Sequence, residues 1–337
     1  MSTDWRIALL QNKKLRVLSF GAGAIGGYLG ACLGLQGHEI SFLERPYNIT
    51  GLKANGIYLT VDSQTRHLAN GNFFPSIREA LANGPYDFAI FALKSYDTQA
   101  ALESLKGFEQ DMPPVLCLQN GVDNEASIAE HVGEDKVIYG TVTTSIGKPA
   151  LGQLVLERQR GIGIGAGHPL SQRITDAMNQ SELNARLYID PLAMKWSKLL
   201  TNLLANAQCA ILDRSPQQIL SAFATYQVEI EQLREALKVM KALNLNVFDL
   251  PGTPVRALAF GAKWLPMRIS QPIILRVAGS GRGNKMPSLH IDRFGGRKRS
   301  EVQWLNGAVV QWGKNMGIET PVNQDLAVKL THLVKNA

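Results

Sequence analysis

The chain has 337 residues, of which 45% are hydrophobic and 19% charged, and it carries a formal net charge of +7. This length predicts two domains, and this composition excludes a disordered chain. Because no apolar run approaches the roughly 20 residues that span a bilayer, no interaction with a membrane is expected. The first residues lack a basic segment followed by a long apolar core, which predicts a cytoplasmic protein.

Short apolar runs alternate with helical segments through the first half of the chain. We expect strands over residues 15–20, 38–43, 57–61, 87–93, 114–118 and 137–142, and helices over 24–36, 98–105 and 127–131. Strands that alternate with helices form a parallel sheet with right-handed crossovers. Because residues 87–93 (DFAIFAL) are apolar after their first position, both faces of this sheet should be covered.

The pattern changes after about residue 188. Helical periodicity extends over residues 191–210, 217–243, 300–316 and 323–336, whereas the Pro- and Gly-rich stretch 251–287 shows no clear pattern. The sequence therefore predicts an α/β domain over residues 1–188, followed by an all-α domain over residues 189–337.

A glycine-rich loop, GAGAIG, lies between the first expected strand and the first expected helix. Gly21 would permit the tight turn, Gly23 would let the backbone approach a pyrophosphate, and Gly26 would let helix and strand pack closely. The helix that follows offers unpaired N–H groups to a phosphate. This placement favours dinucleotide binding over a plain turn, and it predicts that the first domain is of the Rossmann type.

Two residues at the end of the second expected strand favour different cofactors. Glu44 lies about 20 residues beyond the loop, where a carboxylate binds the ribose hydroxyls of NAD and repels a 2′-phosphate. Arg45, directly after it, could accept the 2′-phosphate of NADP. These two residues alone do not decide between NAD and NADP as the cofactor.

The segment MKWSKLLTNLLANAQ (residues 194–208) carries polar residues at helical spacing. Lys198, Asn202 and Asn206 follow one another every four residues, so they should line one stripe of a helix. Lys195 falls near the same stripe, and periodicity alone does not choose between the two lysines. A solvated helix face is the simple alternative to a catalytic one.

The segment 287–323 contains a further candidate. Ser300 can cap a helix that begins near Glu301. The Glu301 carboxylate is then either an active-site group or a surface acid stabilised by the helix dipole.

The remaining residue types exclude several other functions. Cys32, Cys117 and Cys209 are far apart in apolar surroundings, which predicts buried free thiols, and no Cys/His spacing suggests a metal site. Residues 251–300 contain ten Lys and Arg residues and one acid, Asp292. This stretch favours an anionic small molecule over nucleic acid, because it has no recognised nucleic-acid-binding motif.

Taken in order, these segments resemble the ketopantoate reductase (2-dehydropantoate 2-reductase) family. The resemblance runs from the glycine loop through ALKSYDT (92–98), LQNGVDNE (118–125), KWSKLLTN (195–202) and the segment from PSLHID to ETPVN (287–323), so it covers about residues 15–325. It implies a Rossmann domain followed by a helical domain. It also implies NADPH-dependent reduction of 2-dehydropantoate to pantoate, a step of pantothenate biosynthesis.

The resemblance also implies roles for single residues. It assigns Lys198, rather than Lys195, as the general acid and Glu301 as the active-site glutamate. It favours NADPH through Arg45, while Glu44 leaves NAD open. The implied cofactor-binding residues are Gly21, Gly23, Ala24, Ile25, Gly26, Arg45, Lys94 and Asn120, and the implied substrate-binding residues are Asn120, Asn202, Asn206 and Ser288.

The expected partner is a small 2-keto acid, bound by a monomer or a homodimer, with no nucleic acid, membrane or metal. The chain departs from the family at two points: the region after Asn206 (ILDRSPQQIL) lacks a further asparagine, and the interval from Ser288 to Glu301 is one residue longer. A related reductase acting on another keto acid is therefore an alternative. A non-catalytic NAD(P)-sensing protein is a second one, which Lys198, Asn202 and Glu301 together disfavour because a sensor needs no acid.

Overall fold

The computed structural model describes residues 14–276 and 286–336, which form two compact units. The first unit holds the described residues up to Gln119, together with Asn124–Pro191 and Pro251–Thr253. The second unit holds Asn120–Asp123, Leu192–Leu250 and the described residues from Pro254 onward. Each unit therefore includes a short segment that is flanked in the sequence by residues of the other unit.

An eight-stranded sheet forms the centre of the first unit. Its order is β12-β11-β8-β7-β6-β1-β2-β5, and every neighbouring pair is parallel except β11 with β8. The strands are β1 (Arg16–Phe20), β2 (Glu39–Leu43), β5 (Asn72–Phe74), β6 (Phe88–Phe91), β7 (Val115–Cys117), β8 (Val137–Val142), β11 (Ile162–Gly165) and β12 (Ala185–Tyr188). The expectation of a largely parallel α/β sheet is confirmed.

Helices and apolar side chains cover both faces of this sheet. Val17 on β1 packs into one buried cluster and Leu18 into another, because successive side chains of a strand point to opposite faces. The helices of this unit are α2 (Ala24–Leu35), α3 (Pro46–Asn55), α4 (Ile77–Ala82), α5 (Thr98–Glu103), α6 (Asn124–Val132) and α7 (Ser171–Gln180), with short 3-10 turns η1 (Ser95–Asp97) and η2 (Glu134–Lys136).

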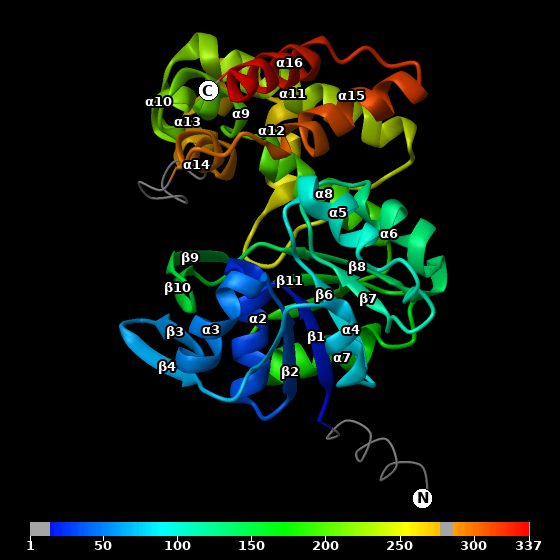
Figure 1. Ribbon diagram of the computed structural model, residues 1–337. Helices are drawn as coiled ribbons and strands as arrows, with labels where there is room; N and C mark the ends of the chain where they lie inside the picture. The colour runs from blue at the N-terminus through cyan, green and yellow to red at the C-terminus, as the bar shows by residue number, and fades with distance from the viewer. Residues whose placement is uncertain (1–13, 277–285, 337) are drawn as a thin grey trace, which may run out of the picture. The chain divides into compact units, whose positions relative to one another are not determined.

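A second sheet packs on the other side of α2. It has the order β4-β3-β10-β9 and consists of β3 (Ile57–Val61), β4 (Gln64–Leu68), β9 (Ser145–Ala150) and β10 (Gln153–Arg158). Figure 1 shows α2 lying between the two sheets. Two glycines of α2 allow this close packing, since a Cβ on Gly30 would meet the Phe42 ring at 2.5 Å and one on Gly27 would meet Leu154 Cδ1 at 3.1 Å.

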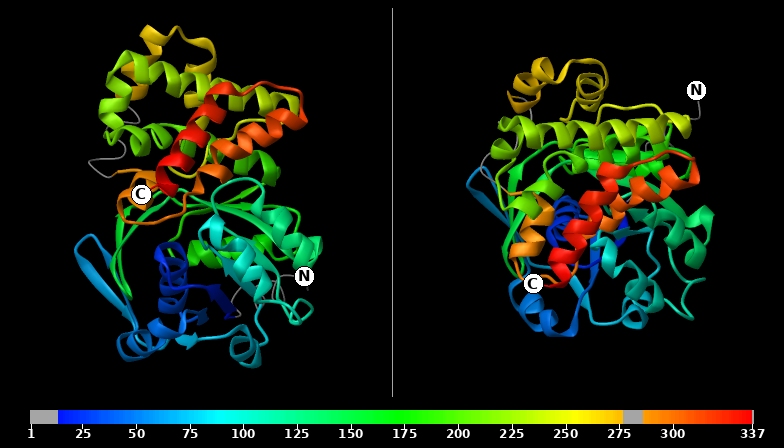
Figure 2. Two further views of the ribbon diagram at one scale, coloured as in Figure 1. Left: turned by 45° about the horizontal axis from the view of Figure 1, so that its top comes forward. Right: turned by 90° about the horizontal axis from the view of Figure 1, so that it is seen from above.

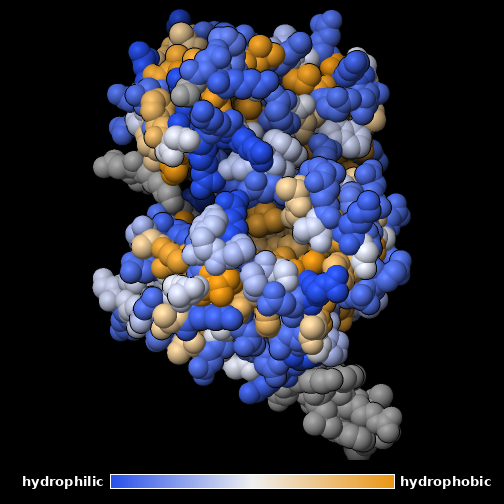
Figure 3. Space-filling view, in the orientation of Figure 1, coloured by the Kyte–Doolittle hydropathy of each residue, from blue (hydrophilic) through white to orange (hydrophobic). Residues whose placement is uncertain are grey.

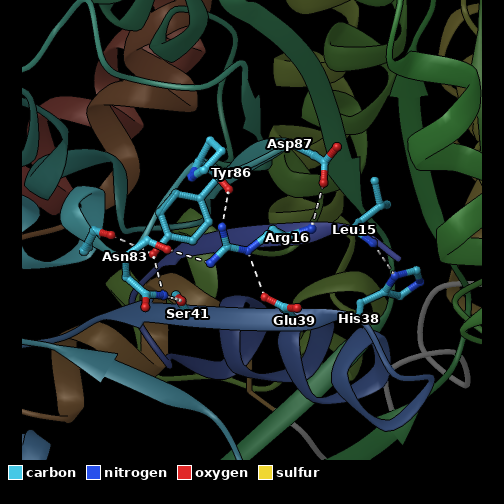
Figure 4. A network of polar contacts seen from close by, with 10 residues as sticks. Leu15, Arg16, His38, Glu39, Ser41, Asn83, Tyr86 and Asp87 are labelled. Atoms are coloured by element: carbon cyan, nitrogen blue, oxygen red, sulfur yellow. Dashed lines mark hydrogen bonds and ion pairs between the residues drawn. The ribbon is translucent and has the colours of Figure 1, made fainter. Parts of the chain in front are cut away.

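A polar network fixes the opposite end of the large sheet, where its parallel strands begin. The Arg16 guanidinium donates to the carbonyl oxygens of Asn83 (2.6 Å) and Pro85 (3.0 Å) and to the Glu39 carboxylate (2.8 Å), as Figure 4 shows. The Arg16 backbone N–H donates to Asp87 (2.8 Å). These bonds join the starts of β1, β2 and β6. The glycine loop lies at the other edge of the sheet, where the strands end.

The regular elements of the second unit are all helices within its described residues. Its elements are α8 (Pro191–Leu203), α9 (Ala207–Leu212), α10 (Pro216–Ser221), α11 (Phe223–Ala242), α12 (Val255–Trp264), α13 (Met267–Ile274), α14 (Ser288–Phe294), η4 (Glu301–Trp304), α15 (Asn306–Asn315) and α16 (Pro321–Lys335). The long helix α11 packs against α15 and α16, which Figure 2 shows from two sides. The stretch left unassigned from the sequence contains α12 and α13.

Three helices expected to be continuous are each divided in two. Residues 191–210 form α8 and α9, 217–243 fall within α10 and α11, and 300–316 form η4 and α15. The backbone leaves the helical region at each break: Ala205 has a φ of 48°, Ala222 is extended, and Leu305 has φ −107° and ψ −90°. None of these residues is a glycine or a proline, so the breaks could not be expected from the residue types at these positions.

The face drawn in Figure 3 is largely hydrophilic, with hydrophobic residues in small patches. No helix within the described ranges is both long and apolar enough to cross a membrane. Cys117 and Cys209 are buried and Cys32 is half-buried, and all three are free thiols. Burial raises the pKa of the Cys32 thiol to about 12, although the hydrogen bond with Tyr28 acts in the opposite direction.

Candidate active site

The glycine loop joins β1 to α2 at the carboxyl edge of the large sheet. Gly21 has a φ of +91°, a value that glycine adopts without strain, and its N–H donates to the Leu43 carbonyl at the end of β2 (2.9 Å). Gly23 is the N-cap of α2, and Ala24 and Ile25 form the first turn of that helix. The loop therefore directs the helix N-terminus toward the edge where parallel sheets bind ligands.

Two glycines of this loop differ in the space that surrounds them. A Cβ on Gly26 would meet Ser19 Oγ at 2.7 Å and would lie closer still to the Gly21 carbonyl oxygen, so only glycine lets α2 pack against β1. A Cβ on Gly23 would meet nothing within 4 Å, so this glycine faces open space. Open space beside unpaired helix N–H groups is what a pyrophosphate needs.

Both polar groups of the Ala22 peptide are held by charged side chains. The N–H of Ala22 donates to Glu44 Oε1 (2.6 Å), and its carbonyl oxygen accepts a hydrogen bond from Lys148 Nζ (3.2 Å). Lys148 comes from β9 of the small sheet. The sequence had not identified it, because a single lysine on a short strand belongs to no motif.

The charged groups of Glu44 and Arg45 differ in their partners and in their exposure. The Glu44 carboxylate accepts three N–H groups of the chain, from Ala22, Arg45 and Asn48, so it is already committed to the loop and to α3. The Arg45 side chain is 66% exposed, and its guanidinium donates to the Tyr47 hydroxyl (2.9 Å) and lies 4.0 Å from the Asp97 carboxylate. The bond to Tyr47 raises the pKa of Arg45 above its usual value, so Arg45 is positively charged at any working pH.

Two more of the expected cofactor-binding residues follow neighbouring strands. Lys94 comes three residues after β6 and is the N-cap of η1, and Asn120 comes three residues after β7. The strands β1, β6 and β7 are adjacent and parallel, so they end at the same edge of the sheet. Asn120 belongs to the second unit.

The two lysines of α8 have different surroundings. Lys195 is 1% exposed, whereas Lys198 is half-buried. Burial raises the pKa of the Asp123 carboxyl, while a hydrogen bond from Trp312 Nε1 (2.7 Å) and the charge of Lys195 oppose this rise. The charge of the buried Lys195 thus acts on Asp123, and the spacing of polar residues alone did not show that the two lysines differ in burial.

The asparagines form a connected chain of hydrogen bonds one turn beyond Lys198. Asn202 Nδ2 donates to Asn120 Oδ1 (3.0 Å), and Asn206 Nδ2 donates to the Asn202 carbonyl (2.9 Å). Asn206 Oδ1 accepts the N–H of Leu289 (3.1 Å), directly after Ser288 at the start of α14. The structure therefore brings Asn120, Asn202 and Asn206 together with the segment of Ser288.

The expectation of one continuous helical stripe is wrong for Asn206. Asn206 lies after the end of α8 and is the N-cap of α9. The break is held by the buried carboxylate of Glu229, which accepts the N–H of Ala205 (2.6 Å) and the amides of Gln208 (2.7 Å) and Gln232 (2.5 Å). The polar residues nevertheless stay together, because the bond from Asn206 to Asn202 spans the break.

Glu301 is the first residue of η4 and is 1% exposed. The hydroxyl of Ser300 caps this turn by accepting the N–H of Val302 (3.2 Å). Burial excludes the alternative of a surface acid. The assignment of Glu301 as the active-site glutamate stays a prediction.

Several side chains of the basic stretch 251–300 have partners within the chain. Arg256 pairs with Asp249 (2.7 Å), Arg297 pairs with the buried Asp292 (3.5 Å), and Arg293 donates to the carbonyl oxygen of Ala210. Three of the ten basic residues thus have contacts within the second unit, and one of them, Arg293, joins α14 to α9.

Models of two protein families match the chain. The model described as "Ketopantoate reductase PanE/ApbA" matches residues 17–169, and the model described as "Ketopantoate reductase PanE/ApbA C terminal" matches residues 190–334. Among curated proteins, the 2-dehydropantoate 2-reductase of Streptococcus pyogenes serotype M3 is 24% identical over 307 residues, which are 89% of this chain and 92% of that protein.

Solved structures share the fold. A PanE/ApbA family ketopantoate reductase from Ralstonia eutropha JMP134 matches with a TM-score of 0.79 at 22% identity, over 96% of this chain and 99% of that one. A D-mandelate dehydrogenase in complex with NADH and anilino(oxo)acetate matches with a TM-score of 0.76 at 19% identity, over the same shares of the two chains. These similarities confirm the expected fold class.

Proposed function

We propose that this chain, which belongs to the ketopantoate reductase family, reduces 2-dehydropantoate to pantoate with NADPH. Its relatives make it an oxidoreductase that acts on CH–OH and C=O groups, and the family reduces keto acids with a pyridine nucleotide. The observation that carries the finer proposal is the chain of asparagines one turn beyond Lys198, because Lys198 would supply a proton donor and the asparagines would supply neutral hydrogen bonds.

Residues of the first unit would hold the cofactor. The loop of Gly21, Gly23 and Gly26 would bind the diphosphate, and Arg45 would bind the 2′-phosphate of NADPH. Glu44 already accepts three N–H groups, so its carboxylate is less able to select NADH through the ribose hydroxyls. When bound, NADPH supplies the hydride.

Residues of the second unit would act on the substrate. As negative charge develops on the carbonyl oxygen at C2, the Lys198 ammonium would stabilise it and donate a proton from Nζ. Asn202, Asn206 and Ser288 would bind the carboxylate and hydroxyl of the substrate without repelling them. Glu301 would orient Lys198 or hold the hydroxyl. We place this reaction in the cytoplasm, as a step of pantothenate biosynthesis.

A reductase of another 2-keto acid is the second candidate. The chain lacks an asparagine in the segment after Asn206, and there Asp213 instead pairs with His290 (2.8 Å) beside α14. The structural similarity to a D-mandelate dehydrogenase shows that the fold also accommodates other substrates.

The decay of NADPH absorbance with 2-dehydropantoate and with a panel of other 2-keto acids tests the proposal. The highest kcat/KM should belong to 2-dehydropantoate with NADPH. A higher value for another acid would favour the second candidate, and binding of NADPH without turnover of any acid would favour a sensor.

Replacing Arg45 by alanine should raise the Kd for NADPH about 10- to 100-fold and leave the Kd for NADH nearly unchanged. The reason is that a charge-assisted hydrogen bond to the 2′-phosphate is worth about 1.5–3 kcal/mol, and NADH has no such phosphate. Titration of the reduced nicotinamide fluorescence measures both constants. Arg66→Ala is the matched control, since Arg66 is also an exposed arginine with one acidic partner in the same unit. Equal weakening of both cofactors would show that Arg45 does not bind the 2′-phosphate.

A further inference from the structure

Lys148 brings a positive charge to the glycine loop from outside the motif. It lies on β9, the edge strand of the small sheet that packs against α2. Its Nζ donates to the carbonyl oxygen of Ala22, which lies between Gly21 and Gly23 (3.2 Å). Nζ, Ala22 and the N-terminus of α2 all belong to the first unit. The small sheet therefore supplies the loop with a cation that the large sheet does not.

The position of this ammonium suits a ligand phosphate. An ammonium has three N–H donors, and the hydrogen bond to Ala22 uses one of them. Gly23, the next residue, faces open space at the N-terminus of α2, where the helix dipole favours negative charge. Glu44, the acid on the other side of the Ala22 peptide, directs its carboxylate oxygens to three N–H donors of the chain. An anion at Gly23 would thus meet both helix N–H groups and the Lys148 charge.

We propose that Lys148 binds the diphosphate of the dinucleotide, which rests on the proposed function and adds a residue to its cofactor site. The diphosphate is common to NADPH and NADH. Lys148 therefore strengthens the binding of both cofactors equally and takes no part in choosing between them, which separates its role from that of Arg45. It also lies on a different element from the loop, so the small sheet becomes part of the cofactor site.

The alternative role for Lys148 is purely structural, as a clamp on the Ala22 carbonyl. Two substitutions separate the roles. Lys148→Gln keeps an N–H donor that can bond to Ala22 but removes the charge, and Lys148→Arg keeps the charge. Lys14→Gln is the matched control, because Lys14 precedes β1 at the opposite end of that strand from the glycine loop. Thermal unfolding of each variant reports whether the loop remains folded.

The Kd values for NADPH, NADH and ADP-ribose are measured by titration at low and high salt, without any keto acid. Lys148→Gln should raise all three values about 10-fold or more and by a similar factor, should weaken their salt dependence, and should leave the melting temperature unchanged. Lys148→Arg and Lys14→Gln should stay within about 3-fold of the wild type. If Lys148→Gln binds all three ligands as the wild type does, or if only NADPH is affected, the proposal is overturned.

The same titrations separate this proposal from the proposed function. A wild-type protein that binds none of the three ligands would refute the proposed function itself, and the role of Lys148 with it. A wild-type protein that binds NADPH and reduces a keto acid, with Lys148→Gln unaffected in binding, would refute only the role of Lys148.

Discussion

Replacing Lys198 by alanine should lower kcat by about 10²- to 10⁴-fold, which is the range that a positioned general acid contributes. The loss should appear in kcat and in kcat/KM, because the proton is donated in the transition state. The Kd for NADPH and the melting temperature should stay near those of the wild type, since Lys198 is only half-buried and the glycine loop lies in the other unit. Steady-state kinetics with the best keto acid of the panel, together with thermal unfolding, measures these effects.

Two further variants test whether the loss of activity is due to the missing proton donor at Lys198. Lys198→Arg keeps a positive charge but cannot donate a proton readily, because the guanidinium pKa is above about 12, so kcat should remain low. Lys195→Met should instead lower the melting temperature, since Lys195 is nearly fully buried and its charge acts on the half-buried Asp123. Wild-type turnover in Lys198→Ala would exclude Lys198 as the acid.

Alanine at Gly23 and alanine at Gly26 should each abolish cofactor binding, but only the second should destabilise the fold. At Gly26 the methyl group would lie 2.7 Å from Ser19 Oγ, and such overpacking costs about 1–3 kcal/mol. At Gly23 the methyl group would enter open space, so the free energy of unfolding should hardly change. That same space is where we place the diphosphate, so the Kd for NADPH should rise beyond the measurable range.

Urea unfolding and NADPH titration of the two variants test this pair. Binding of NADPH by Gly23→Ala with wild-type affinity would show that the cofactor does not approach the loop there. Equal destabilisation by both substitutions would show that Gly23 has a packing role.

The sequence predicted five strands of the large sheet well because their signals are local, whereas β5, β11 and β12 were not among the expected strands. The apolar runs at β1, β2, β6, β7 and β8 are short and buried on both faces, and GAGAIG lies directly between a strand and a helix. The small sheet was mostly missed. Its strands β4, β9 and β10 are largely exposed and carry polar residues such as Gln64, Lys148 and Glu157, so they lack the alternation that marks a strand.

The sequence predicted the residue types of the candidate site, but it did not predict the break in the backbone between α8 and α9. The break between α8 and α9 depends on Glu229, which lies 24 residues from the Ala205 N–H that it accepts. No local pattern reveals such a contact, and alanine is an unusual residue for a left-handed conformation. The burial of Glu301 could not be predicted either, because its position at the start of a helical pattern fits a surface acid equally well.

The interleaving of the two units has a consequence for how this protein can be cut, fused or recombined. A polypeptide ending at Pro191 would lack Pro251, whose carbonyl oxygen accepts the Thr143 hydroxyl (2.8 Å) in the first unit. A polypeptide starting at Leu192 would lack Asn120, the partner of Asn202 in the second unit. Neither piece is a self-sufficient module, so exchange of halves between homologous genes would break polar contacts inside both, and selection should keep the two halves inherited as one.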